Sequence, residues 1–149
     1  MTKKSLKIAE MARQWHGGDR DARYLGYFDC FNRGLFYEAH DVLEDLWLAD
    51  RNSPDYAFYK GLIQLAGAFV HLQKHSEQRP RLGPSAALFL LARRNLEQYP
   101  ALHHGLEIAA VLALISHWLN KLEEGGFEEN PLEREKPPVL VLSPKTGGT

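Results

Sequence analysis

The sequence is poor in cysteine, in net charge and in long apolar runs. Cys30 is the single cysteine among 149 residues, which excludes an internal disulfide and is typical of a cytoplasmic protein. The 18 basic side chains balance 19 acidic ones, and the net charge of −1 argues against a nucleic-acid partner. The most apolar stretch, residues 106–122, is interrupted by polar side chains and is too short to cross a bilayer, so no membrane association is expected.

Length and composition predict one globular domain. Apolar residues make up 44% of the chain and charged residues 25%, a balance that allows a hydrophobic core without disulfides or a structural metal. We expect this domain to occupy residues 1–126. Residues 127–149 contain four of the eight prolines, so an extended arm or a flexible tail is expected there.

The hydrophobic periodicity predicts an all-α fold, an antiparallel bundle of about five helices. The expected helices lie at about residues 21–33, 35–49, 54–75 and 83–99, and from residue 105 to the glycines at 125–126, after a weaker leading segment at residues 3–15. Asp19 or Asp21 could cap the first of them. Gly34 separates the first two, which predicts a leading αα-hairpin. Ser53 before Pro54 indicates the start of the third helix. The last helix is apolar nearly all round, which favours a central position.

His40 and Glu44 form the first candidate site, on the second predicted helix. They are four residues apart, so their side chains lie on one face and can touch. A carboxylate in this position can orient an imidazole, and both groups suit a shared ion or a proton transfer. The alternative interpretation is a buried hydrogen-bonded pair with a structural role alone.

A second candidate set follows one stripe of the third predicted helix. Lys60, Gln64, Gly67 and His71 recur at helical spacing, and small residues alternate with the polar ones. Such a stripe suits the close approach of another helix, with polar groups bonded across the contact. The second predicted helix is the expected neighbour. On that hypothesis His40, Glu44, Gln64 and His71 converge on one cleft between the two helices.

The remaining histidines indicate no site of their own. A histidine follows His71 four residues later, as in the zinc motif H-E-x-x-H, but Leu72 stands where that motif has its glutamate. His103 and His104 lie near a predicted helix start, apart in sequence from the other candidates. His117 shares a stripe with apolar residues, which predicts a core histidine.

Two stretches resemble a known family: FNRGLFYEAHDVLEDLW at residues 31–47 and KGLIQLA at residues 60–66. They are similar to the domain-of-unknown-function 309 family, and the resemblance covers roughly residues 21–96. It implies a small all-helical protein of a kind labelled predicted metal-dependent hydrolase.

The family motif falls on residues of both predicted helices. An E-A-H-E-x-x-E run that ends in tryptophan matches Glu38, His40, Glu44 and Trp47, with Asp41 in place of a glutamate, and the downstream part matches Gly61, Gln64 and His71. Aspartate keeps the charge of the glutamate it replaces but has a shorter reach.

Two classes of function are consistent with these residues. In the first, a hydrolase, a divalent metal ion is held by His40, Glu44 and His71, with Glu38 and Glu44 as the catalytic carboxylates. The residues assigned to binding or to the surroundings of the metal are Gln64, Trp47, Lys60 and Asn32. In the second, the same groups form a structural hydrogen-bond network. The chain is then a non-catalytic module that binds protein partners, a small molecule or a second copy of itself.

Overall fold

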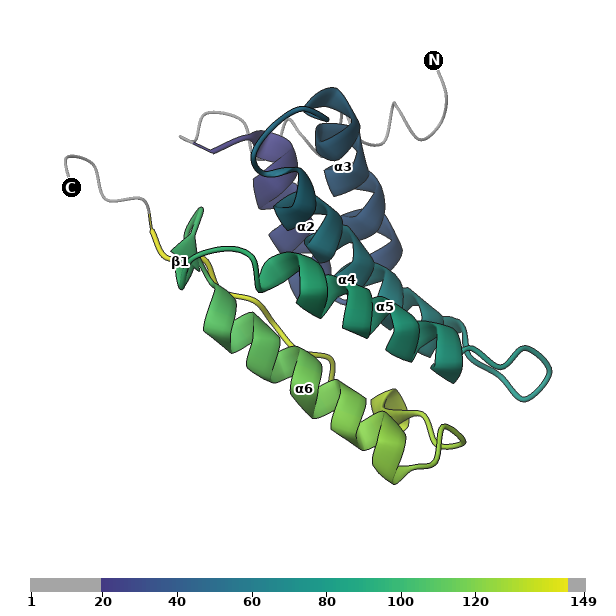
Figure 1. Ribbon diagram of the computed structural model, residues 1–149. Coiled ribbons are helices and arrows are strands. Elements are labelled where there is room, and N and C mark those ends of the chain that lie inside the picture. Colours follow the sequence, from purple (N-terminus) through teal and green to yellow (C-terminus); the bar gives the residue numbers. More distant parts are fainter. Residues whose placement is uncertain (1–19, 145–149) are drawn as a thin grey trace, which may run out of the picture.

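Five α-helices form the body of the protein in the computed structural model, which describes residues 20–144 (Figure 1). They are α2 (Ala22–Asn32), α3 (Phe36–Ala49), α4 (Tyr56–Lys74), α5 (Leu82–Leu96) and α6 (Ile108–Glu124). A short hairpin of β1 (Leu102–His103) and β2 (Leu106–Glu107) joins α5 to α6, and a 3-10 turn, η1 (Pro131–Glu133), follows. The predicted all-helical bundle is confirmed. The leading segment at residues 3–15 lies outside the described residues.

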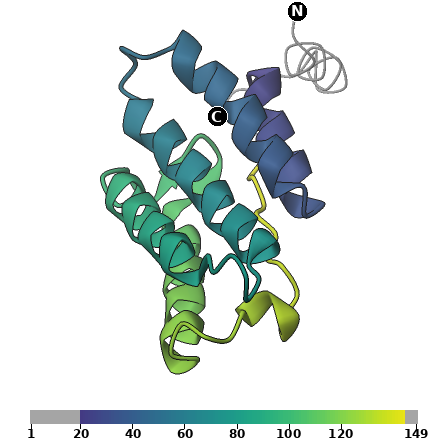
Figure 2. The same ribbon diagram turned by 90° about the vertical axis from the view of Figure 1, so that its right-hand side faces the viewer.

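The first helix of the leading αα-hairpin, α2, ends where the sequence predicted. Gly34 has φ +74°, in the left-handed region that favours glycine, and its N–H donates to the carbonyl of Phe31 over 3.0 Å. The chain turns there, and α2 and α3 pack side by side (Figure 1, Figure 2).

The central helix is α4, because the other four helices meet at its Phe69. The ring of Phe69 is fully buried and lies 4.9 Å, between ring centroids, from Phe36 of α3 and 5.7 Å from Phe31 of α2. Its other contacts are with Phe89 of α5 at 5.2 Å and Trp118 of α6 at 5.1 Å. Aromatic rings with these separations contribute both buried area and favourable ring geometry to the core.

The prediction that the last helix is central was wrong. α6 buries one face, which includes Ile115 and Trp118, and exposes Ala109, Ala110 and Ala113 on the other. The sequence looked apolar all round because these alanines are apolar but small, and alanine on a helix surface exposes little apolar area. His117 is also exposed, and its Nε2 lies 2.7 Å from a carboxylate oxygen of Glu135, so it is not a core histidine.

The start of α4 differs from the prediction in a way that matters for the site. Ser53 Oγ accepts the N–H of Asp55 over 3.0 Å, which closes a turn before the helix instead of capping it. Asp55 is the N-cap residue, but its carboxylate makes no capping hydrogen bond. The carboxylate is therefore available for other contacts.

Residues 127–144 lie against the bundle. Asn130 of the turn before η1 is buried and donates a hydrogen bond of 2.7 Å to the carbonyl of Leu72 in α4. The chain then runs back along α6 to the hairpin (Figure 1), and Leu140 is buried on the way. The separation of a domain at residue 126 stays a prediction. No helix among residues 20–144 has the length and apolar character needed to cross a membrane.

Candidate metal centre

His40 and Glu44 lie together on α3, as their spacing predicted. The Nε2 atom of His40 is 3.8 Å from a carboxylate oxygen of Glu44, and its Nδ1 atom is 3.3 Å from Oδ1 of Asp41. All three side chains are partly exposed. The imidazole is therefore placed between two carboxylates of its own helix.

Gln64 faces a different helix from the one expected. Its Oε1 atom accepts a hydrogen bond of 2.7 Å from Asn95 of α5. The small residues of the same stripe also meet α5, since a Cβ added at Gly61 would lie 2.8 Å from Cγ of Leu96, and one at Gly67 would lie 3.1 Å from Leu88. The close helix contact that the stripe predicted exists, but it joins α4 to α5 and not to α3.

His71 lies in the last turn of α4, in cationic surroundings. Its Nδ1 atom is buried and has no hydrogen-bond partner. Burial lowers the pKa of His71, and the charges of Arg81 and Lys74 lower it further. The neutral imidazole is therefore favoured at this position.

The other predicted site residues have the following contacts: Lys60 and Trp47 share one neighbour, Tyr56. Lys60 Nζ is 5.8 Å from the centre of the Tyr56 ring, and the Trp47 ring is 5.1 Å from the same ring. Glu38 is in the first turn of α3, where the negative charge of a carboxylate interacts favourably with the helix dipole. Asn32 bonds to the backbone of Leu140. The assignment of a metal to His40, Glu44 and His71 stays a prediction.

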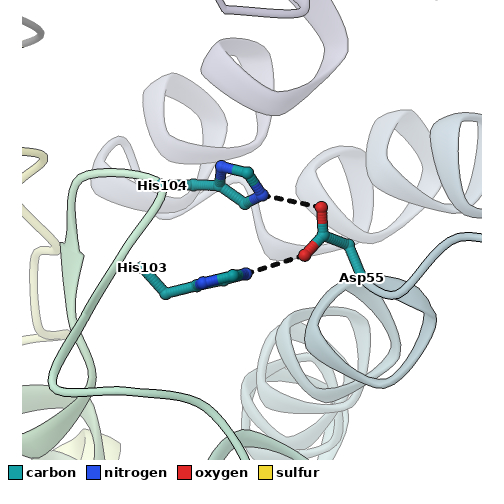
Figure 3. Close-up of side chains that lie close together, drawn as sticks. All are labelled: Asp55, His103 and His104. Atoms are coloured by element: carbon teal, nitrogen blue, oxygen red, sulfur yellow. Dashed lines mark hydrogen bonds and ion pairs between the residues drawn. The ribbon is translucent and has the colours of Figure 1, made fainter.

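Within residues 20–144, one group brings three metal-binding side chains together: Asp55, His103 and His104, with one ligand atom from each within 4.8 Å of the others. Nε2 of His103 lies 2.7 Å from Oδ1 of Asp55, and Nε2 of His104 lies 2.7 Å from Oδ2 (Figure 3). Each oxygen of one carboxylate thus faces one imidazole, and both rings carry their proton on Nε2 when the carboxylate is charged.

The β1–β2 turn brings the two histidines to this place. His104 and Gly105 are its central residues and have φ +47° and +78°, as in the tight hairpin turns that follow the twist of the strands. A positive φ is uncommon for a residue other than glycine and costs free energy, so contacts around the turn have to maintain it. One of them is the Tyr24 hydroxyl, which donates a hydrogen bond of 2.8 Å to the carbonyl of His104.

Aromatic rings orient the imidazoles. The His103 ring lies 4.7 Å from the ring of Phe58, edge to face, and 4.8 Å from the ring of Tyr99. The Tyr99 hydroxyl accepts the N–H of Phe58 and donates to the carbonyl of Pro54, both over 2.9 Å. Tyr99 thereby connects the start of α4, which carries Asp55, to the segment that leads into the hairpin.

The electrostatics favour a charged Asp55. Burial is the largest influence and raises its pKa, but the hydrogen bonds and positive charges of His104 and His103 together outweigh it, so the pKa of Asp55 lies below its usual value. The side chains of Asp55 and His103 are 18% and 21% exposed, and that of His104 is 45% exposed. The group is thus open to solvent on the side of His104.

Sequence reasoning missed these three residues, because Asp55 and the histidines are 48 and 49 positions apart. One local pattern did point to the hairpin: LHHGLE at residues 102–107 places two polar residues and a glycine between apolar ones. That pattern is typical of a hairpin, whereas the segment was assigned to a helix start.

Comparison with known proteins shows that part of the chain is similar to a known family. An uncharacterized protein of Aquifex aeolicus (strain VF5) is 28% identical over 126 residues, which are 84% of this chain and 36% of that protein. The chain therefore spans about a third of the length of this relative. No solved structure matches the chain. The family model described as Domain of unknown function (DUF309) matches residues 24–79, which include Asp55 but neither His103 nor His104. The family resemblance is thereby confirmed over residues 24–79.

Proposed function

We propose that the chain binds a divalent transition-metal ion through Asp55, His103 and His104, and that this centre serves a metal-dependent hydrolase. The observation that carries the proposal is the pairing of each oxygen of the Asp55 carboxylate with an imidazole Nε2 at 2.7 Å. The hydrolase part of the proposal rests on the family resemblance. The proposal assigns the metal to these three residues instead of to the set predicted from the sequence, His40, Glu44 and His71.

The donor set fits such an ion. Two imidazoles and a carboxylate are ligands that zinc, iron and manganese accept, and three protein ligands leave coordination positions for water and substrate. Ligand atoms within 4.8 Å of one another need only small side-chain movements to reach one ion. When bound, such an ion polarises a carbonyl or phosphoryl oxygen and lowers the pKa of a water molecule.

The protein's own groups would prepare the centre. The Asp55 carboxylate supplies negative charge, and its low pKa keeps that charge at neutral pH. Phe58 and Tyr99 restrict the rotation of the His103 ring, so the direction of its Nε2 atom is fixed. The greater exposure of His104 leaves an approach from solvent. Protons compete with the ion for both Nε2 atoms, so affinity should rise with pH.

Metal titration tests the proposal. Protein without an affinity tag is stripped with a chelator, and Zn²⁺ and Co²⁺ binding is measured for the wild type, Asp55→Asn and His103→Ala. Loss of a ligand should weaken binding by more than about 100-fold, since even groups behind the ligands contribute 10–100-fold. His117→Ala is the matched control, because His117 also pairs with a carboxylate at 2.7 Å but has no second histidine beside it.

His40→Ala separates the two metal hypotheses. If metal binding depends on His40 and not on Asp55 or His103, the set predicted from the sequence is the metal site and the proposal is wrong. Hydrolysis is then assayed with chromogenic carboxylic esters, phosphoesters and amides in the presence of each metal. Activity that requires metal and disappears in Asp55→Asn supports the hydrolase. Metal binding without hydrolysis of any substrate class limits the proposal to metal binding.

A second function is favoured by the contact of Gln64. Because the Gln64 amide accepts a hydrogen bond from Asn95 of α5, the Gln64 stripe supports a structural network that joins α4 to α5. On this proposal the Gln64 stripe of α4 has a structural role, and it stabilises a module that is not catalytic. Gln64→Leu and Asn95→Leu should then lower thermal stability and leave metal binding unchanged.

A further inference from the structure

The C-terminal arm, defined as residues 139–143, lies in extended conformation between α2 and β2. Its side chains alternate, with Leu140 buried and its neighbours Val139 and Val141 exposed at 61% and 77%. Leu142 forms an antiparallel bridge with Leu106 of β2. The arm therefore adds a third strand segment to the β1–β2 hairpin.

One side chain of α2 holds this arm by two hydrogen bonds. The Asn32 amide donates from Nδ2 to the carbonyl of Leu140 over 2.8 Å, and its Oδ1 accepts the N–H of Leu140 over 2.7 Å. The two residues are 108 positions apart. A primary amide that bonds to both groups of one residue reproduces the pairing of a neighbouring strand, so Asn32 fixes both the place and the register of the arm.

The arm is also hydrogen-bonded to the β1–β2 hairpin, which carries the two histidines. The N–H of Ser143 donates to the carbonyl of Gly105 over 2.7 Å, and Arg20 Nη2 donates to the carbonyl of Ser143 over 2.8 Å. Gly105 directly follows His104. Hydrogen bonds at Leu140 and at Ser143 thus connect the two ends of the arm to Asn32 and to the backbone of the candidate metal centre.

The hairpin needs this support. It consists of only two residue pairs, Leu102 with Glu107 and His103 with Leu106, and an isolated hairpin of that size is not stable in water. His104 also holds a positive φ. Contacts with α2 maintain the turn at two places, directly through Tyr24 at the carbonyl of His104 and indirectly through Asn32 and the arm.

We propose that Asn32 is a positioning residue that acts through the C-terminal arm on the centre formed by Asp55, His103 and His104. The inference rests on the proposed function, because it assigns Asn32 an effect on metal affinity. The aromatic contacts of Phe69 with the other helices do not involve Asn32, so removal of the Asn32 amide should leave the bundle folded and loosen the hairpin. Ligands that are no longer held in place bind an ion more weakly.

The test compares Asn32→Ala with Asn130→Ala in the full chain. Asn130 is a matched control, because its amide also makes two backbone hydrogen bonds, far from the hairpin in sequence. Its Nδ2 donates to the carbonyl of Leu72 at 2.7 Å, and its Oδ1 accepts the N–H of Leu132 at 3.1 Å. Asn32→Ala should weaken Zn²⁺ binding by about 10–100-fold, the usual effect of a group behind the ligands. Asn130→Ala should lower the melting temperature at least as much, with a change in affinity below about 2-fold.

A second measurement does not depend on metal. Imidazole ¹⁵N chemical shifts report whether the Nε2 atoms of His103 and His104 are hydrogen-bonded in the chelator-treated protein. Asn32→Ala should shift these signals toward those of solvated imidazoles, and Tyr24→Phe should act in the same direction, whereas Asn130→Ala should leave them unchanged.

The outcomes distinguish the two proposals. Unchanged metal affinity in both Asp55→Asn and His103→Ala overturns the proposed function, and the imidazole signals of Asn32→Ala then decide the positioning role. If Asp55→Asn loses the metal while Asn32→Ala binds as the wild type does, or loses no more affinity than Asn130→Ala, the positioning role is wrong and the metal centre stands. Imidazole signals that Asn32→Ala leaves unchanged also count against positioning.

Discussion

The Nε2 atom of His103 lies 2.7 Å from Oδ1 of Asp55, although the two residues are 48 positions apart in the chain. This contact and its counterpart at His104 join the N-terminus of α4 to the hairpin before α6. The same carboxylate is thus both a candidate ligand and a connection between distant parts of the fold. Its role in stability is testable separately from any metal.

Acid should remove the stabilising effect of Asp55. Its pKa in the folded protein lies below the unfolded value of 3.8, so its contribution is present above about pH 4 and is lost as the pH falls through the folded pKa. Asp55→Asn should therefore lower the free energy of unfolding by about 1–2 kcal/mol at pH 7 and by less near pH 3. Urea unfolding at both pH values measures this. Asp45→Asn, which removes an exposed pair with Arg23, should change stability much less.

The turn of the hairpin gives a second prediction. Gly105 has φ +78°, a backbone conformation that residues with a Cβ rarely adopt, so Gly105→Ala should destabilise the protein by about 1–2 kcal/mol. Gly83→Ala in the first turn of α5 is the control: nothing lies within 4 Å of an added Cβ there, and the change should stabilise slightly. Equal effects of the two substitutions on chemical denaturation would show that the turn tolerates a side chain.

Local signals predicted the helices well because their causes are local. Gly34 ends α2 through its own φ, and the contact of His40 with Glu44 follows from their spacing on one helix. The start of α4 was misplaced by two residues, since Pro54 and Asp55 belong to a turn and the helix begins at Tyr56.

The candidate centre could not be predicted, because its contacts are not local. Nothing near Asp55 in sequence indicates that His103 lies opposite, since the hairpin position depends on the whole path through α4 and α5. The small-residue stripe of α4 is a second example of a contact whose partner the local sequence does not identify. Gly61 and Gln64 correctly predicted a close helix contact. The pattern on α4 alone does not indicate which helix makes that contact, and in the structure it is α5.

The close contact of α4 with α5 gives a third prediction. A Cβ at Gly61 would lie 2.8 Å from Cγ of Leu96 and 3.2 Å from Cβ of Asn95, so Gly61→Ala should cost about 1–3 kcal/mol of unfolding free energy. Leu96→Ala removes the first of these atoms. If the helices meet as described, the double variant should lose less than the sum of the two single losses; strict additivity would place Gly61 away from Leu96.

His71 should make the protein sensitive to mild acid. Burial, Arg81 and Lys74 lower its pKa in the folded state below the unfolded value of 6.5, so the unfolded chain takes up the proton first and stability falls as the pH drops through about 6.5. His71→Leu also replaces the buried Nδ1 that lacks a partner, and it should flatten the fall in melting temperature between about pH 7.5 and 5.5. The exposed His117 provides the control, since His117→Gln leaves His71 in place and the fall should persist. A fall of the same size in His71→Leu would assign the sensitivity to another group.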